Sequence, residues 1–209
     1  MHYTKVMQEE IIGVGPHPEP WPTDEKYDRM LLKEGDKRNV LDKYHYWTVS
    51  AIKADLDDGR IGLEIAIENL QRDYNMGTIV RVANAFNIQK VHIIGRKQWN
   101  KRGAMVTDLY MHIQYHDDVK AFAEAMKQQK REMIAVDIVK GAKNLSETEL
   151  PKDAVLVFGA EGPGLSKEML TAASTTVMIE QFGSTRSVNV GVAAGITMYA
   201  WLQQHALTR

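Results

Sequence analysis

From residue 61 to the C-terminus, short Val- and Ile-rich segments alternate with segments of helical periodicity. The extended segments lie at residues 63–69, 90–95, 132–139, 154–159 and 175–180, and the helical ones at 77–86, 118–129, 166–173 and 188–204. Strands of this composition, separated by helices, are typical of parallel sheets covered on both faces. The pattern therefore predicts an α/β domain over residues 61–209, with a mainly parallel sheet and helices on both faces.

The first 60 residues have a different character. Four of the six prolines fall between Pro16 and Pro22, in PHPEPWP, and alternating prolines favour an extended path. Residues 1–25 therefore form either an arm or a flexible tail, and the helical signals that follow are interrupted at Gly35. We expect residues 1–60 to be an arm with a small helical appendage. Its charged and aromatic residues either pack the appendage or help to hold RNA: Arg38, Lys43, Tyr44, Tyr46 and Trp47.

Composition narrows the functional classes. The chain has 209 residues, 44% of them hydrophobic and 25% charged, which is typical of one globular domain with an appendage. No apolar run approaches the ~20 residues of a membrane span, and the N-terminus is not organised as a signal peptide, so we expect a cytoplasmic protein. The absence of cysteine excludes disulfides and thiolate metal sites. A net charge of -1 means that any nucleic-acid contact must be a local patch.

Polar residues gather where predicted strands end, which is where ligands bind in such sheets. In the first of three such loops a strand ends near Asn69, and Asn75 with Gly77 then opens a helix that carries Arg81. Asn75 could cap that helix. Arg81 lies among apolar neighbours, so it is either paired structurally or directed at a ligand.

The second loop, VFGAEGPGLS, places Gly159, Gly162 and Gly164 around Glu161. Glycines allow backbone amides to approach a ligand closely. However, a P-loop requires Gly-Lys-Ser/Thr, and the dinucleotide pattern G-x-G-x-x-G has a different spacing and follows a first strand. Glu161 would also repel a phosphate.

The third loop, GSTRSVNVG, leads into the final helix. Ser187 and Asn189 stand where the chain is expected to become buried, so each either caps the helix or belongs to a site. The helix carries a strip of small residues and a strip of bulky ones, which are Gly191, Ala194 and Gly195, and Val188, Val192, Ile196 and Tyr199. A helix that is apolar nearly all round is buried in a core or in a subunit interface.

Three segments resemble, in order and spacing, the three motifs of the SpoU (TrmH-like) family of SPOUT RNA methyltransferases. They are NMGTIVRVANAF, VFGAEGPGLS and VMIEQFGSTRSVNVGVAAGITMYAW. The resemblance covers residues 61–204. Two departures stand out: Met76 and Thr78 replace a common proline and asparagine, and residues 179–182 lack the usual proline and methionine. Neither departure removes a residue with an expected chemical role.

The resemblance implies an α/β fold with a C-terminal trefoil knot, a homodimer, S-adenosylmethionine bound in the knot, and methyl transfer to a ribose 2′-hydroxyl of tRNA or rRNA. By position, the residues that hold the cofactor would be Gly159, Ile179, Gly183 and Val188. The catalytic residues would be Arg81, Asn75, Glu161, Ser187 and Asn189.

A basic segment, GRKQWNKRG at residues 95–103, supplies the local charge that RNA binding needs. Positive charges suit phosphates and an aromatic ring suits base stacking, although such a run can also be a solvated loop. The residues expected to bind RNA are Arg96, Lys97, Trp99, Lys101 and Arg102. His112 and His116 are spaced i, i+4, but we expect no metal site.

Two other functions compete with this interpretation. A non-catalytic RNA-binding module could share the fold, although the intact set of expected catalytic residues speaks against it. A nucleotide-dependent oxidoreductase would need a dinucleotide fingerprint after the first strand, and ENLQRDYNMG does not supply one.

Overall fold

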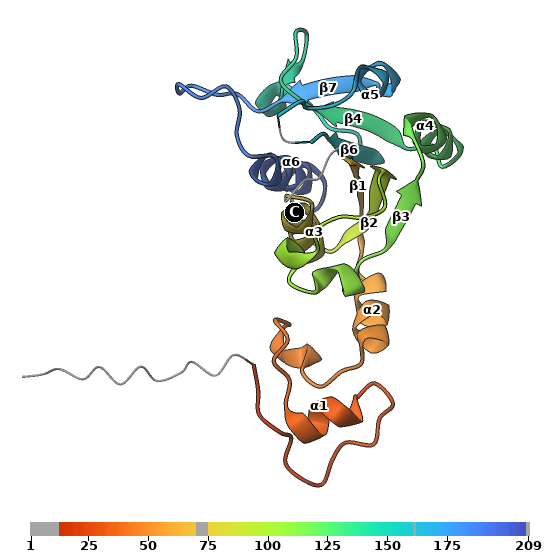
Figure 1. Cartoon of the computed structure of the whole chain (residues 1–209), viewed down its shortest axis with the longest axis vertical. Coiled ribbons are helices and arrows are strands. Elements are labelled where there is room, and N and C mark those ends of the chain that lie inside the picture. The colour runs from red at the N-terminus through yellow and green to blue at the C-terminus, as the bar shows by residue number, and fades with distance from the viewer. Residues whose placement is uncertain (1–12, 70–74, 161, 208–209) are drawn as a thin grey trace, which may run out of the picture. The chain divides into compact units, whose positions relative to one another are not determined.

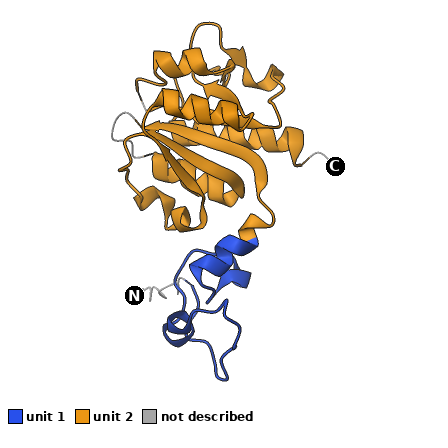
Figure 2. Ribbon diagram, turned by 90° about the vertical axis from the view of Figure 1, so that its right-hand side faces the viewer, with its two compact units in different colours: residues 1–55 blue, residues 56–209 orange. Residues whose placement is uncertain are grey.

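The computed structural model describes residues 13–69, 75–160 and 162–207. The chain divides into two compact units, Met1–Asp55 and Leu56–Arg209, which are coloured separately in Figure 2. The second unit contains the sheet and all three of the motif-bearing segments.

The second unit is built on a seven-stranded sheet with the order β3-β2-β1-β6-β4-β7-β5. Every strand pairing within it is parallel, which confirms the parallel sheet predicted from the alternation. The strands are β1 (Ile61–Asn69), β2 (Ile88–Gly95), β3 (Ile113–His116), β4 (Glu132–Val136), β5 (Lys143–Asn144), β6 (Ala154–Phe158) and β7 (Thr175–Met178).

Helices cover both faces of this sheet (Figure 1), as predicted. One apolar cluster joins the sheet to α3 and α6 and includes Ile79 and Met198, and the other joins it to α4 and α5 through Phe122 and Met169. The helices are α3 (Met76–Ala85), α4 (Val119–Gln128), α5 (Lys167–Ala172) and α6 (Val190–His205), with short 3₁₀ helices η2 (Arg102–Ala104), η3 (Thr107–Tyr110) and η4 (Leu145–Glu147). No helix among the residues described is long and apolar enough to cross a membrane.

Two strands, β3 and β5, were not predicted from the sequence. β3 is a four-residue edge strand and β5 has only two residues, so neither offers enough alternation to be recognised. The apolar segment expected to be extended over 132–139 leaves the sheet after Val136. Asp137 follows, and its Oδ1 accepts a hydrogen bond from the N–H of Ile138 at 2.7 Å.

The first unit contains α1 (Arg29–Glu34), the 3₁₀ helix η1 (Asp42–Tyr44) and the beginning of α2 (Val49–Asp57). α1 starts at Asp28, whose carboxylate accepts from the N–H groups of Met30 and Leu31. It ends at Gly35, where φ is +92°, so the interruption predicted there is confirmed.

Ion pairs hold Arg38 and Lys43, the two basic residues of this unit that were considered for RNA binding. Arg38 donates two hydrogen bonds to the fully buried carboxylate of Asp36, at 2.9 and 2.7 Å. Burial alone would raise the pKa of Asp36, but hydrogen bonds from Arg38 and Tyr46 lower it to about 2. Lys43 pairs with Asp55 at 2.8 Å. The packing alternative for these basic residues is therefore the one that their contacts favour.

Candidate cofactor and RNA site

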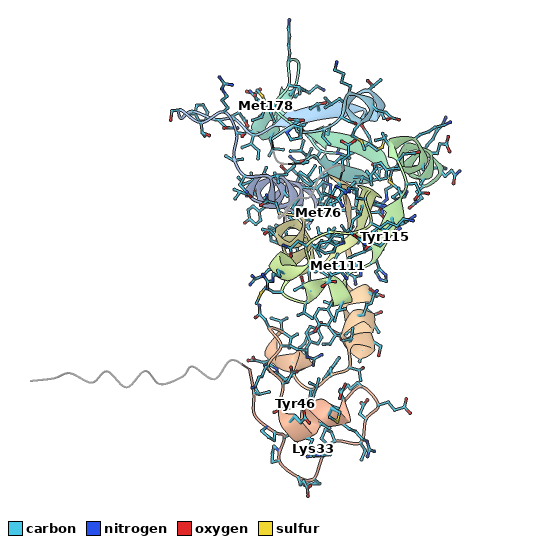
Figure 3. The ribbon with its side chains drawn as sticks, in the orientation of Figure 1. Lys33, Tyr46, Met76, Met111, Tyr115 and Met178 are labelled. Carbon is cyan, nitrogen blue, oxygen red and sulfur yellow. The ribbon has the colours of Figure 1, made fainter. Side chains whose placement is uncertain are left out.

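A cavity of about 200 Å³ lies at the carboxyl ends of β4, β6 and β7, three neighbouring strands of the parallel sheet. Figure 3 labels Met178, the last residue of β7, which borders it. The cavity is lined by Val136, Asp137, Ile138, Gly159, Ala160, Gly162, Gly164, Met178, Ile179, Gln181, Ser187, Val188, Asn189, Val190 and Ala193. Two of the three motif-bearing segments thus form its walls.

The glycines after β6 allow the loop to fold back on itself. A Cβ on Gly159 would lie 2.2 Å from the carbonyl carbon of Gly164, and Gly164 itself has φ +71°. The N–H of Gly164 donates to the carbonyl of Ala160 at 3.1 Å and closes the turn. Close packing therefore requires glycine at 159 and 164, and a positive φ of +97° favours it at 162, so the path of the loop itself explains the three glycines.

Two carboxylates hold this loop in place by accepting hydrogen bonds from its backbone N–H groups. Asp137 Oδ2 accepts from the N–H of Leu165 at 2.8 Å, and Glu68 Oε2 accepts from the N–H of Ser166 at 2.8 Å. They come from the ends of β4 and β1, the strands on either side of β6. Sequence reasoning missed both residues, although an acidic residue closing an apolar strand is a visible signal.

The polar atoms of the cavity fit an organic ligand with hydrogen-bond donors. Gln181 Oε1 is buried and has no hydrogen-bond partner among the residues described. A buried acceptor of this kind is costly unless a ligand or water supplies the donor. Of the expected cofactor residues, Gly159, Ile179 and Val188 line the cavity, whereas Gly183 does not.

Asn189 connects the starts of two helices. Its Oδ1 caps α6 by accepting from the N–H groups of Gly191 at 2.9 Å and Val192 at 3.4 Å, so the predicted cap is confirmed. Its Nδ2 donates to Asn75 Oδ1 at 2.9 Å. Asn75 stands at the N-cap position of α3 but makes no side-chain capping bond, so its predicted capping role is wrong. Its side-chain oxygen instead accepts from Asn189, 114 residues away in the chain.

Ser187 borders the cavity from an exposed position, and Asn189 is exposed as well. The expectation that both are buried is wrong, because the first buried residue after this loop is Gly191. The small residues of α6 allow this helix to pack closely on α3. A Cβ on Gly191 would lie only 3.0 Å from Thr78 Cγ2.

Arg81 lies in the second turn of α3 with its side chain exposed. Its neighbours Ile79 and Val80 point into the core. Within the described ranges Arg81 makes no ion pair, which favours the ligand alternative over a structural pair. Glu161, expected to complete the catalytic set, lies outside the described residues.

The basic segment packs against the start of α3. A Cβ on Gly77 would lie 2.6 Å from the N atom of Ala104 and 2.8 Å from Gly103 Cα, so this approach requires glycine. Arg96 and Arg102 are exposed and have no ion pair with any residue that the structure describes. The arginines of this segment therefore remain available beside the helix that carries Arg81.

The two lysines of the segment have acidic partners. Lys97 pairs with Asp117 at 3.3 Å, and Lys101 pairs with Asp108 at 2.8 Å. The hydrogen bond that Lys101 donates to the Asp108 carboxylate raises the pKa of Lys101. The Lys97–Asp117 pair is exposed at both ends and is therefore weak, so Lys97 keeps part of its attraction for phosphate. Lys101 is held more firmly, because the side chain of its partner Asp108 is only 7% exposed.

Trp99 is partly buried. It packs against the apolar cluster under α3, and its Nε1 lies 3.5 Å from the hydroxyl of Tyr115, which Figure 3 labels. Part of its ring is therefore committed to the core, and the remainder is available for base stacking.

The two histidines at i, i+4 have separate partners. His112 Nε2 lies 2.8 Å from Asp57, while His116 Nε2 lies 2.9 Å from Nδ1 of the buried His92. Burial lowers the pKa of His116, and the neighbouring His92 lowers it further. Among the described residues no group of three or more His, Cys, Asp or Glu side chains is arranged to hold a metal ion.

Comparison with known proteins places this geometry in context. The family model described as the SpoU rRNA Methylase family matches residues 62–199. A tRNA (guanosine(18)-2′-O)-methyltransferase of Thermus thermophilus is 24% identical over 145 residues, which cover 66% of this chain and 72% of that protein. The enzyme of the same name from Escherichia coli K12 is 22% identical over 140 residues, covering 66% of this chain and 61% of the relative.

Solved structures share the fold. The A. aeolicus TrmH/SpoU tRNA modifying enzyme superposes with a TM-score of 0.66 and 24% identity, over 75% of this chain and 81% of that one. A structure whose description concerns the 2-OH methylation of C/U34 on tRNA superposes with a TM-score of 0.60 and 27% identity, over 68% of this chain and 95% of that one. An rRNA methyltransferase from Sinorhizobium meliloti, solved with AdoMet bound, superposes with a TM-score of 0.60 and 22% identity, over 73% of this chain and 61% of that one.

Proposed function

We propose that this chain, which belongs to the SpoU rRNA Methylase family, transfers a methyl group from S-adenosylmethionine to a ribose 2′-hydroxyl of tRNA or rRNA. One observation carries the proposal: the cavity at the strand ends is bounded by two motif-bearing segments and is tied to the third by the Asn75–Asn189 hydrogen bond. The relatives named as tRNA 2′-O-methyltransferases support the same reaction. A module that only binds RNA would have no need for this constellation.

The cavity is the proposed cofactor site. Main-chain groups of Gly159, Ile179 and Val188 would hold S-adenosylmethionine, which supplies a methyl group on a positively charged sulfur. Gln181 Oε1 would accept a hydrogen bond from one of its N–H or O–H donors. Gly183 and Glu161 retain the roles implied by their positions in the family motifs.

Arg81 is proposed to act on the RNA and not as a base. A guanidinium has a pKa above ~12 and holds its proton at neutral pH. It can grip a phosphate with two parallel N–H donors and stabilise negative charge that develops on the 2′-oxygen. Its exposed position in the second turn of α3 suits a polymeric substrate that arrives from solvent.

The remaining polar residues would align the reacting centres. Asn189 uses both ends of its side chain to join α6 to α3, so it would fix Arg81 relative to the cavity. Ser187 brings its hydroxyl to the rim of the cavity, where it could hydrogen-bond the target ribose. Alignment of this kind supplies much of the rate enhancement of a displacement reaction.

RNA would bind along the basic segment. Arg96 and Arg102 would make the strongest phosphate contacts, because the lysines already have acidic partners. The exposed part of Trp99 would stack on a base. Since the RNA is present in the cytoplasm, that is where we propose the enzyme works.

The family resemblance also leads us to propose a SPOUT methyltransferase domain over residues 61–209, with a C-terminal trefoil knot, and an N-terminal appendage over residues 1–60. Support for the knot comes from the loops after β4, β6 and β7, which converge on one cavity. The far end of α6 is anchored to an earlier segment, because Trp201 Nε1 donates to the carbonyl of Pro151 at 2.8 Å.

A homodimer is proposed through the exposed face of α6. Val192, Ile196 and Tyr199 are 53%, 42% and 47% exposed, and their i, i+4, i+7 spacing makes an apolar stripe. Such a stripe is costly in water and is expected to be covered. A second copy is the occupant proposed, since the stripe lies on the helix that also borders the cavity.

Transfer of labelled methyl from S-adenosylmethionine to purified tRNA and, separately, to rRNA tests the proposal. Label in one RNA pool, lost in the Arg81→Ala variant, is the expected result. Absence of label in both pools, together with no binding of the cofactor, would contradict the reaction and favour the module that only binds RNA.

A further inference from the structure

Asp137 differs from the other polar residues of the cavity because it carries a full negative charge at its wall. Its two oxygens accept from the N–H groups of Ile138 at 2.7 Å and Leu165 at 2.8 Å. In the part of the chain that the structure describes, no Lys, Arg or His forms an ion pair with it. Among the described residues, its charge is therefore offset by backbone N–H dipoles.

Glu68 provides an internal comparison. It holds the next amide of the same loop, that of Ser166, with the same 2.8 Å distance. It is 1% exposed and is not among the residues that line the cavity. The two carboxylates thus share the task of holding the loop, but only Asp137 presents its charge to a ligand in the cavity.

We infer that Asp137 is a specificity-determining residue that makes the cavity distinguish the positively charged cofactor from its neutral-sulfur product. This inference rests on the proposed function. Methyl transfer removes one positive charge from the bound ligand. The S–CH3 bond breaks with its electron pair left on sulfur, an O–CH3 bond forms at the ribose 2′-oxygen, and the proton of that hydroxyl passes to solvent. A carboxylate in the wall stabilises the ligand before transfer and stabilises it less afterwards, which favours exchange of product for fresh cofactor.

The size of the effect follows from Coulomb's law. A sulfonium bound about 6 Å from the carboxylate, at an effective dielectric near 20, would bind about 100-fold more tightly than a neutral sulfur, and the partial exposure of Asp137 reduces this factor. We therefore expect the ratio of the dissociation constants for S-adenosylhomocysteine and S-adenosylmethionine to fall by about tenfold when the charge is removed.

Calorimetric titration of the full-length protein with each ligand tests the inference, using wild type, Asp137→Asn and Glu68→Gln. The expected result is a tenfold fall of the ratio in Asp137→Asn only. Glu68→Gln is expected to weaken both ligands equally, because it loosens the loop without changing the charge at the wall. An unchanged ratio in Asp137→Asn, or an equal change in both variants, would overturn the inference.

Salt dependence of the wild-type ratio gives a second measurement that needs no variant, in case Asp137→Asn does not fold. Screening of the partly exposed Asp137 charge should lower the ratio as ionic strength rises from about 0.05 to 1 M. A ratio that stays constant over this range would overturn the inference while leaving the methyltransferase proposal intact. Failure of the wild type to bind either ligand would overturn both.

Discussion

Replacement of Gly159 by alanine probes the loop that forms one wall of the cavity. The added Cβ would lie 2.2 Å from the carbonyl carbon of Gly164 and 2.5 Å from the N atom of Leu165. Ordinary contacts begin at 3.4 Å, so the loop must move by more than 1 Å. All of the crowding atoms belong to the backbone, which cannot rotate away as a side chain can.

The cost can be worked from the bond that this movement breaks. The N–H of Leu165 is held by the Asp137 carboxylate at 2.8 Å. A hydrogen bond to a charged group contributes about 1.5–3 kcal/mol. Since about 1.4 kcal/mol is a tenfold change in affinity, the dissociation constant for S-adenosylmethionine should rise about 10- to 150-fold.

Calorimetric titration measures this change, and thermal unfolding shows whether the variant still folds. Gly62→Ala is the matched control, because Gly62 has nothing within 4 Å of an added Cβ and its φ is not positive. It should bind the cofactor like the wild type. A folded Gly159→Ala protein with wild-type affinity would refute the account of the loop and of the cavity as the cofactor site.

Three further outcomes are expected. Arg81→Lys should lower turnover at least about tenfold while cofactor affinity stays within twofold, because lysine keeps the charge but loses the planar pair of donors; full turnover with an unchanged pH profile would contradict the phosphate grip. Neutralising Arg96 and Arg102 together should weaken RNA binding and lower the magnitude of the slope of log affinity against log salt by about 0.7 to 0.9 for each phosphate that is no longer neutralised. Lys101→Gln should have a smaller effect. An unchanged slope would mean that RNA does not bind along this segment. Ile196→Glu should give a monomer in analytical ultracentrifugation by placing a charge in the apolar stripe, whereas a persistent dimer would assign the interface elsewhere.

The sheet and its helices could be predicted because their sequence signals are local. The apolar segments of β1 and β6 and the small-residue strip of α6 carry their own periodicity or composition. β3 gave no such signal, since an edge strand of four residues is stabilised by its pairing with β2 and not by its own pattern. Short elements of this kind depend on contacts that are distant in the chain.

The sequence predicted which residues belong to the site better than it predicted the contacts between them. The motifs identified Asn75 and Asn189, but the hydrogen bond between them joins positions 114 residues apart, and a local capping argument gave the wrong partner for Asn75. Asp137 was overlooked because it follows an apolar run that was expected to continue as a strand. Its importance appears only when β4 is placed beside β6 and the glycine loop lies above it.

The position of the methyl group on the RNA tests the central claim most directly. A ribose 2′-O-methyl group removes the hydroxyl that alkali needs to cleave the following phosphodiester bond. After transfer of labelled methyl and complete alkaline hydrolysis, the proposal predicts that the label appears in an alkali-stable dinucleotide. Label recovered in mononucleotides would mean that a base is methylated, and it would contradict 2′-O-transfer by this site.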